Sequence, residues 1–164
     1  MCDYSLFAIP NRLAKEQEDL VAHRFPTGSM GLASHADLCR NAQLRQEKPA
    51  NRGLWSVIRS FFTMPKMEPV PAVCIPPGAR LRLHDIPVRL QQELGVGAEE
   101  DVVFTQTSAS VNTYRDAIRF ASGRELNLQE LREGQRVHVV SLALAEPMPA
   151  RVEEEAHPML YRVR

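Results

Sequence analysis

Cys2 is the residue whose position most directly suggests chemistry in this chain of 164 residues. A small residue after Met1 normally allows removal of the initiator methionine, which would leave Cys2 with a free α-amino group. That amine titrates at roughly 7.7–8.0, so it can act as a base beside the thiol of the same residue. Cys2 is therefore a candidate nucleophile of an N-terminal-cysteine amidohydrolase or amidotransferase. The simpler interpretation is a small apolar side chain on the inner face of a first strand.

Cys74 is a second sulfur that pairing of the predicted strands would bring near Cys2. A thiolate metal site would need further ligands, and the sequence contains no CxxC, HxH or HExxH spacing. The five histidines are scattered and mostly adjoin charged residues, which is typical of surface histidines. Cys2 and Cys74 remain candidate metal ligands as an alternative hypothesis, and we predict no cofactor.

Residues 53–64 form the strongest predicted helix, which ends before Pro65. The helix holds the only tryptophan and two of the six phenylalanines, and its apolar residues occupy more than one face. From Arg40 to Lys66 there are six basic residues and one acidic residue, a net charge of +5. From His84 to Asp101 there are one basic and five acidic residues, a net charge of −4. Charge is therefore segregated along a chain whose total charge is zero.

The aromatic and basic segment 40–66 is the predicted contact surface. Tryptophan and arginine are typical anchors of protein interfaces, and cations steer association toward an acidic or apolar groove on a partner protein. Two alternatives stay open: the aromatic side chains cap the open end of a barrel, or the segment contacts a membrane surface peripherally. The residues that we expect to bind the partner are Arg52, Trp55, Ile58, Arg59, Phe61 and Phe62.

Short apolar segments bounded by proline and glycine predict a mainly β protein. Alternation of apolar and basic residues over 79–83 is typical of a half-buried strand, and Gly123 fits a hairpin turn. Helices are predicted at 35–45, 53–64 and 87–94. The predicted strands cover 2–9, 20–25, 72–75, 79–83, 102–107, 113–120, 125–128 and 137–144.

We expect a small antiparallel barrel or half-barrel of about six to eight short strands with a helical insertion. Residues 1–33 and 70–145 would form the barrel domain. Residues 34–69 would be the inserted contact arm, and residues 146–164 would be a carboxyl-terminal tail.

The composition, 44% apolar and 24% charged, is that of a globular chain. Zero net charge argues against a nucleic-acid binder, which would carry a basic excess. No secretory signal opens the chain and no apolar run is long enough to span a bilayer. Three cysteines are an odd and sparse set, so we expect a cytoplasmic protein with reduced thiols.

The opening Met-Cys-Asp-Tyr-Ser-Leu resembles that of a family of small uncharacterised bacterial proteins. The resemblance extends to Arg24-Phe25-Pro26, to residues 73–78 and to much of residues 116–141, about half of the chain. It carries no activity, and it directs attention to Cys2 and Cys74. The start is also similar to the Met-Cys-Gly start of class II glutamine amidotransferases, with Asp3 in place of glycine.

These observations lead to the expectation of a non-catalytic accessory or assembly subunit. The barrel would be a scaffold, and segment 40–66 would dock on a larger protein complex.

Overall fold

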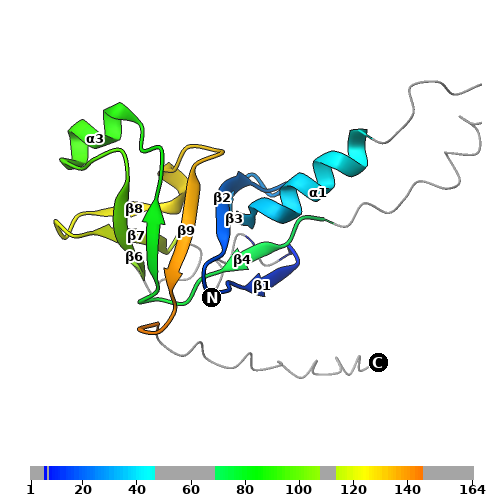
Figure 1. Ribbon diagram of the computed structural model, residues 1–164, viewed down its shortest axis with the longest axis horizontal. Coiled ribbons are helices and arrows are strands. Elements are labelled where there is room, and N and C mark those ends of the chain that lie inside the picture. Colours follow the sequence, from blue (N-terminus) through cyan, green and yellow to red (C-terminus); the bar gives the residue numbers. More distant parts are fainter. Residues whose placement is uncertain (1–5, 7, 47–68, 108–113, 146–164) are drawn as a thin grey trace, which may run out of the picture.

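The computed structural model describes residues 6, 8–46, 69–107 and 114–145 (Figure 1). The side chains of residues 45 and 46 are outside this description. In chain order the elements are β1 (Asn11–Leu13), β2 (Asp19–Arg24), β3 (Met30–Ser34), α1 (His35–Gln46), β4 (Ala72–Cys74), β5 (Arg80–Leu83), α3 (Val88–Leu94), β6 (Glu100–Gln106), β7 (Asp116–Phe120), β8 (Glu125–Asn127), the 3-10 turn η2 (Leu128–Glu130) and β9 (Arg136–Ser141).

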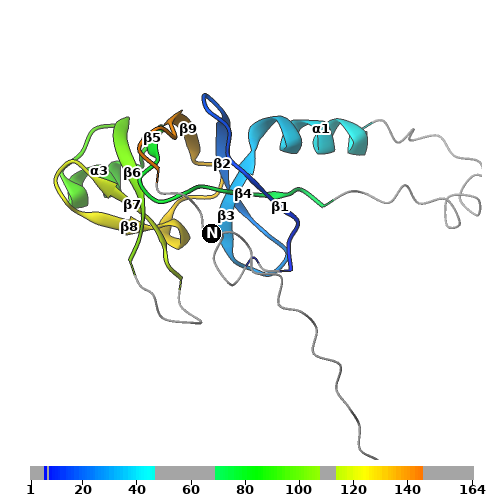
Figure 2. The same ribbon diagram turned by 90° about the horizontal axis from the view of Figure 1, so that it is seen from below.

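One mixed sheet of nine strands forms the body, in the order β1-β4-β3-β2-β9-β5-β6-β7-β8. β1 and β4 are parallel, and the other neighbours are antiparallel. The protein is mainly β, as predicted. The end strands β1 and β8 lie at opposite ends of the sheet and do not pair (Figure 2). The expectation of a closed barrel is therefore wrong, and the sheet has nine strands and one parallel pair where six to eight antiparallel strands were expected. The fold is an open sheet in which β9 lies between β2 and β5.

The period-2 pattern of β5 positions the main core. Leu81 and Leu83 are buried whereas Arg80 and Arg82 are exposed, because successive side chains of a strand point to opposite faces. The buried leucines belong to a core to which strands β2 to β9 all contribute. Phe104 in this core is the largest fully buried side chain among the described residues. Arginines of the same strand are left on the outer face, where the candidate site lies.

A second, smaller core lies between α1 and the first part of the chain. Its buried members are Leu6, Ile9, Phe25, Ala33 and Ala72. The predicted strand 2–9 is wrong for the residues described in it, because the Ile9 N–H donates to the Leu6 carbonyl at 3.0 Å and closes a turn. The strand begins only after Pro10, whose carbonyl accepts the Ala72 N–H at 2.8 Å. Proline has no N–H of its own but can still accept at a strand edge.

Several predicted elements are confirmed. α1 spans the predicted helix 35–45, and α3 ends at Gly95 in the left-handed conformation, with φ of 67°. The β7–β8 hairpin turns at Gly123, with φ of 82°. The predicted helix 53–64 lies outside the described residues, as does the tail 146–164.

β3 was not predicted, since Gly31 reads as a turn residue in the sequence. A Cβ on Gly31 would lie 2.7 Å from Leu6 Cδ1 and 3.0 Å from a ring carbon of Phe25. Glycine is therefore used inside this strand so that the second core can pack closely against its backbone.

Candidate functional site

Most residues singled out from the sequence lie outside the part of the chain that the structure describes. Cys2 is one of them, and so are the six expected contact residues: Arg52, Trp55, Ile58, Arg59, Phe61 and Phe62.

Cys74 is described, at the end of β4, where it is 6% exposed. Its sulfur is disulfide-bonded, whereas Cys39 on α1 is a free and exposed thiol. The disulfide departs from the expectation of reduced thiols. A disulfide sulfur is not a thiolate ligand, so metal binding by Cys74 would first require reduction. Among the described residues, no group of three His, Cys, Asp or Glu side chains is placed to hold a metal ion.

A polar hollow lies on the outer face of the sheet where β2, β9 and the end of β5 meet the start of α1. Its cavity volume is about 170 Å³. The polar side chains that line it are Asp19, His35, His84 and Arg136. Leu20, Val21 and Val137 complete the lining, but Leu20 and Val137 are buried in the main core and only Val21 is partly exposed. This region is the candidate functional site, and it is called the polar hollow below.

Two of the polar side chains are held by residues that do not line the polar hollow. Arg136 donates from Nε to Asp85 at 2.8 Å, and this bond lowers the pKa of the Asp85 carboxyl below its usual value. Asp19 Oδ1 lies 2.7 Å from Nδ1 of His138, whose Nε2 lies 3.2 Å from the Gln17 amide oxygen. Both polar groups are therefore oriented in advance by a further hydrogen bond.

The other two polar side chains, His84 and His35, also contact residues that do not line the polar hollow. Nδ1 of His84 is 3.0 Å from a carboxylate oxygen of Glu99. Nε2 of His35 is 3.6 Å from the Cys39 sulfur, one turn further along α1. This Cys–His contact is a nucleophile beside a base, which is the minimal pairing for nucleophilic catalysis. No third residue of the described chain orients the imidazole, so the contact does not by itself constitute a catalytic site.

Two residues around the polar hollow adopt positive φ without being glycine: Gln17, with φ of 59°, and Asp85, with φ of 54°. They are the residues that hold His138 and Arg136, respectively. Such backbone conformations cost about 1 kcal/mol or more and persist where the surrounding structure fixes them. Sequence reasoning missed the polar hollow because its side chains come from four separate segments.

Four of the five carboxylates of the acidic segment 84–101 form ion pairs within the described chain. The pairs are Asp85 with Arg136, Glu93 with Arg89, Glu99 with His84, and Asp101 with Arg82. The hydrogen bond from Arg82 lowers the pKa of Asp101, as that from Arg136 does for Asp85. Arginines of β5 and β9 thus offset two of the four net negative charges of this segment.

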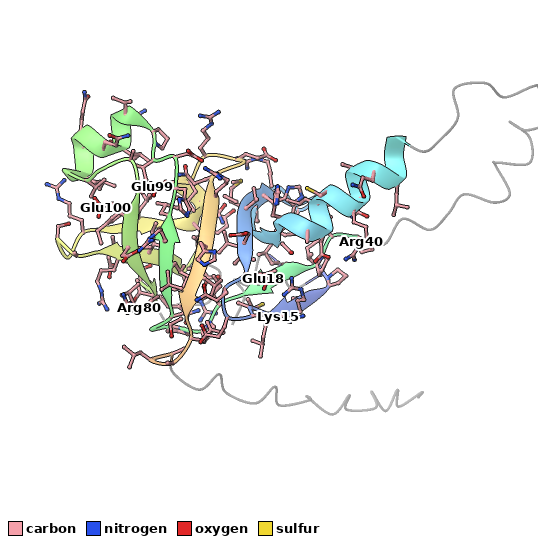
Figure 3. All side chains as sticks on the ribbon, in the orientation of Figure 1. Lys15, Glu18, Arg40, Arg80, Glu99 and Glu100 are labelled. Carbon is pink, nitrogen blue, oxygen red and sulfur yellow. The ribbon has the colours of Figure 1, made fainter. Side chains whose placement is uncertain are left out.

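The start of α1 meets His84 of the acidic segment at the polar hollow, and the helix then extends away from the rest of that segment. Figure 3 shows Arg40 on α1 at one end and Glu99 and Glu100 near α3 at the other. No residue of α1 from 35 to 44 is fully buried, and Leu44 is 55% exposed. Only Leu38 packs against the second core. This described start of the predicted arm is thus an exposed helix whose far end leads into segment 47–66.

Comparison of the chain with protein-family models, with curated proteins and with solved structures finds no match. The resemblance carried by the opening residues is therefore neither supported nor contradicted. No helix among the described residues is long and apolar enough to cross a bilayer.

Proposed function

We propose that this protein is a non-catalytic accessory or assembly subunit that docks on an acidic or apolar groove of a larger protein complex. Segment 40–66 is the docking arm, and the nine-stranded sheet is the scaffold that carries it.

The proposal rests on one observation, the internal pairing of the acidic segment. Asp85 and Asp101 each accept a hydrogen bond from an arginine of the sheet, at 2.8 and 2.7 Å. Carboxylates engaged in this way are poor counter-charges for another segment, because a second cation would have to compete with the first. The net charge of +5 between Arg40 and Lys66 is thus best matched by a partner molecule.

The exposure of α1 also supports the proposal. A helix packed mainly for stability buries an apolar stripe, yet α1 contributes only Leu38 to a core and leaves Leu44 exposed. Arg40 exposes 71% of its side chain, and its only ion pair within the described chain is with Asp37, at 3.4 Å. Such a helix suits the base of a projecting arm.

The test uses the tagged full chain, expressed at native level in its own cells. The wild-type protein is expected to elute from size-exclusion chromatography in a stoichiometric complex well above its own mass of 18.5 kDa. Trp55→Ala/Phe62→Ala is expected to elute as the free subunit, since buried aromatic anchors carry most interface energy.

Val88→Ala/Arg89→Ala is the matched control, because it removes an exposed apolar side chain and an exposed cation from α3. It is expected to keep the complex. Circular dichroism and urea unfolding confirm that both variants are folded. A wild-type protein that elutes alone, or a Trp55/Phe62 variant that keeps the complex, contradicts the proposal.

A further inference from the structure

The polar hollow offers one cation and one anion at a fixed separation. In the β2–β9 register Asp19 is opposite His138 and Val21 is opposite Arg136. Asp19 and Arg136 are therefore diagonal neighbours on the same face, a relationship that spans about 7–8 Å between backbones. Asp19 is close enough to contribute to the raised pKa of Arg136, for which the hydrogen bond to Asp85 is the larger cause.

Both charged groups keep bonding capacity. Within the described chain the guanidinium of Arg136 is bound only through Nε, so its two terminal nitrogens remain for a ligand carboxylate. Asp19 is bound only through Oδ1 among the same residues, so Oδ2 remains for a ligand ammonium group. His84 is bound through Nδ1 and can offer Nε2 as a further polar contact.

The remaining lining sets the size and polarity of the ligand. A cavity of roughly 150 Å³ can hold a molecule as small as benzene. The polar hollow is of that order, well below the volume of drug-sized pockets. Val21 is the partly exposed apolar side chain of the lining, whereas Leu20 and Val137 are buried in the main core.

We propose that the polar hollow binds a small zwitterion of the α-amino-acid class with a short aliphatic side chain. The ligand carboxylate binds Arg136, its ammonium group binds Asp19, and its side chain contacts Val21. This inference is independent of the docking arm and adds a small-molecule site on the scaffold.

Other charged ligands bring a like charge close to one of the two groups. A simple anion would bind Arg136 next to the carboxylate of Asp19, and a simple cation would bind Asp19 next to the guanidinium. A metal ion finds no set of three suitable ligands among the described residues. A zwitterion places an opposite charge beside each group in addition to its partner in the chain, and specificity of this kind comes from the penalty on the wrong ligand.

The test is a titration of the full chain, followed by amide nuclear magnetic resonance, with three matched probes. L-Valine carries both charges, 3-methylbutanoate lacks the ammonium group, and 2-methylpropylamine lacks the carboxylate. Saturable shifts with L-valine are expected at up to about ten millimolar, with each analogue about ten-fold weaker or more. Equal binding of either analogue, or no saturation with L-valine, overturns the proposal.

Variants locate the site. Arg136→Gln and Asp19→Asn are each expected to weaken L-valine binding about ten-fold, since each removes one charge-assisted contact. Both side chains are largely exposed, so folding is expected to be retained. Arg82→Gln and Asp101→Asn are the matched controls, because they remove the same charges from the same face outside the polar hollow. Loss of binding in the controls equal to that in the test variants overturns the placement of the ligand.

Discussion

The guanidinium of Arg12 and the carboxylate of Glu18 form an ion pair that joins β1 to the turn before β2. Arg12 Nη1 donates to Glu18 at 3.0 Å, and the backbone N–H of Lys15 donates to the same carboxylate at 3.0 Å. Arg12 also lies 3.6 Å from Asp37 of α1. Figure 3 shows Glu18 and Lys15 together at this junction. Three elements around the second core thus share one charged contact.

Glu18→Gln is expected to lower the free energy of unfolding by about 1–2 kcal/mol, because a partly buried charge-assisted contact is lost. Burial raises the pKa of Glu18, but the hydrogen bonds from Arg12 and the Lys15 N–H outweigh it, and the net pKa is lowered. The stabilisation is therefore complete above the ordinary pKa of 4.5 and is lost as pH falls through the lowered pKa. Urea unfolding at neutral and acidic pH measures both effects.

Arg82→Gln serves as the comparison, because the Arg82–Asp101 pair is about half exposed on both sides. It is expected to leave the free energy of unfolding nearly unchanged, because solvent screens an exposed pair. Equal losses of unfolding free energy in Glu18→Gln and Arg82→Gln would show that the Arg12–Glu18 pair stabilises the protein no more than an exposed pair does.

Gly78 and Gly123 have nearly the same backbone conformation, with φ of 87° and 82°, but different surroundings. A Cβ on Gly78 would lie 2.6 Å from the Leu144 carbonyl oxygen, whereas a Cβ on Gly123 would contact nothing within 4 Å. Gly123→Ala should cost about 1 kcal/mol for the left-handed backbone alone. Gly78→Ala should cost about 1–3 kcal/mol more, since backbone must move. Similar unfolding midpoints in urea for the two variants would contradict the close approach of residue 144.

His23 should make the free energy of unfolding decrease as the pH falls below neutrality. Burial lowers the pKa of His23 below 6.5, and the nearby Glu133 carboxylate, 3.9 Å away, opposes the shift only in part. The unfolded chain therefore binds the proton more tightly, so this contribution is present above pH 6.5 and declines as pH falls through the lowered pKa. His23→Gln should flatten the loss of stability between about pH 7.5 and pH 5, measured by urea unfolding. Identical pH slopes for wild type and variant would exclude this role.

Local signals predicted most of the elements. The alternation at 80–83 gave β5, and the glycines at 95 and 123 marked the ends of α3 and β7. Gly31 misled the prediction of β3, because its missing side chain serves packing against Leu6 and Phe25 rather than a turn. Local sequence signals do not show which strands pair with one another. The parallel pairing of β1 with β4 and the open sheet were therefore not predicted.

The polar hollow shows why sites of this kind escape sequence reasoning. Asp19 and His138 are 119 residues apart and meet only because β9 pairs with β2. Neither residue has a motif around it, and the same is true of Arg136. The sequence did indicate Cys74 as a residue worth testing, but its chemistry in the structure is that of a disulfide rather than a free thiol.

The last prediction concerns that disulfide. The chain has three cysteines and Cys39 is free, so we predict that Cys74 is bonded to Cys2 of the same chain, a residue outside the described part. Iodoacetamide is expected to label one thiol per chain before reduction and all three after unfolding in reductant. Peptide mapping without reductant should recover one cross-linked species containing residues 2 and 74.

Reduction is expected to lower the free energy of unfolding by about 2–4 kcal/mol, the usual effect of opening a long loop. Cys39→Ser is the control, since it removes the free thiol and should leave the effect of the reductant unchanged. Three reactive thiols in the untreated protein, or a covalent dimer on a non-reducing gel, would contradict the bond within one chain. The intramolecular bond would in turn withdraw the Cys2 thiol from both the nucleophilic and the metal-binding hypotheses, because a sulfur held in a disulfide is neither a nucleophile nor a thiolate ligand.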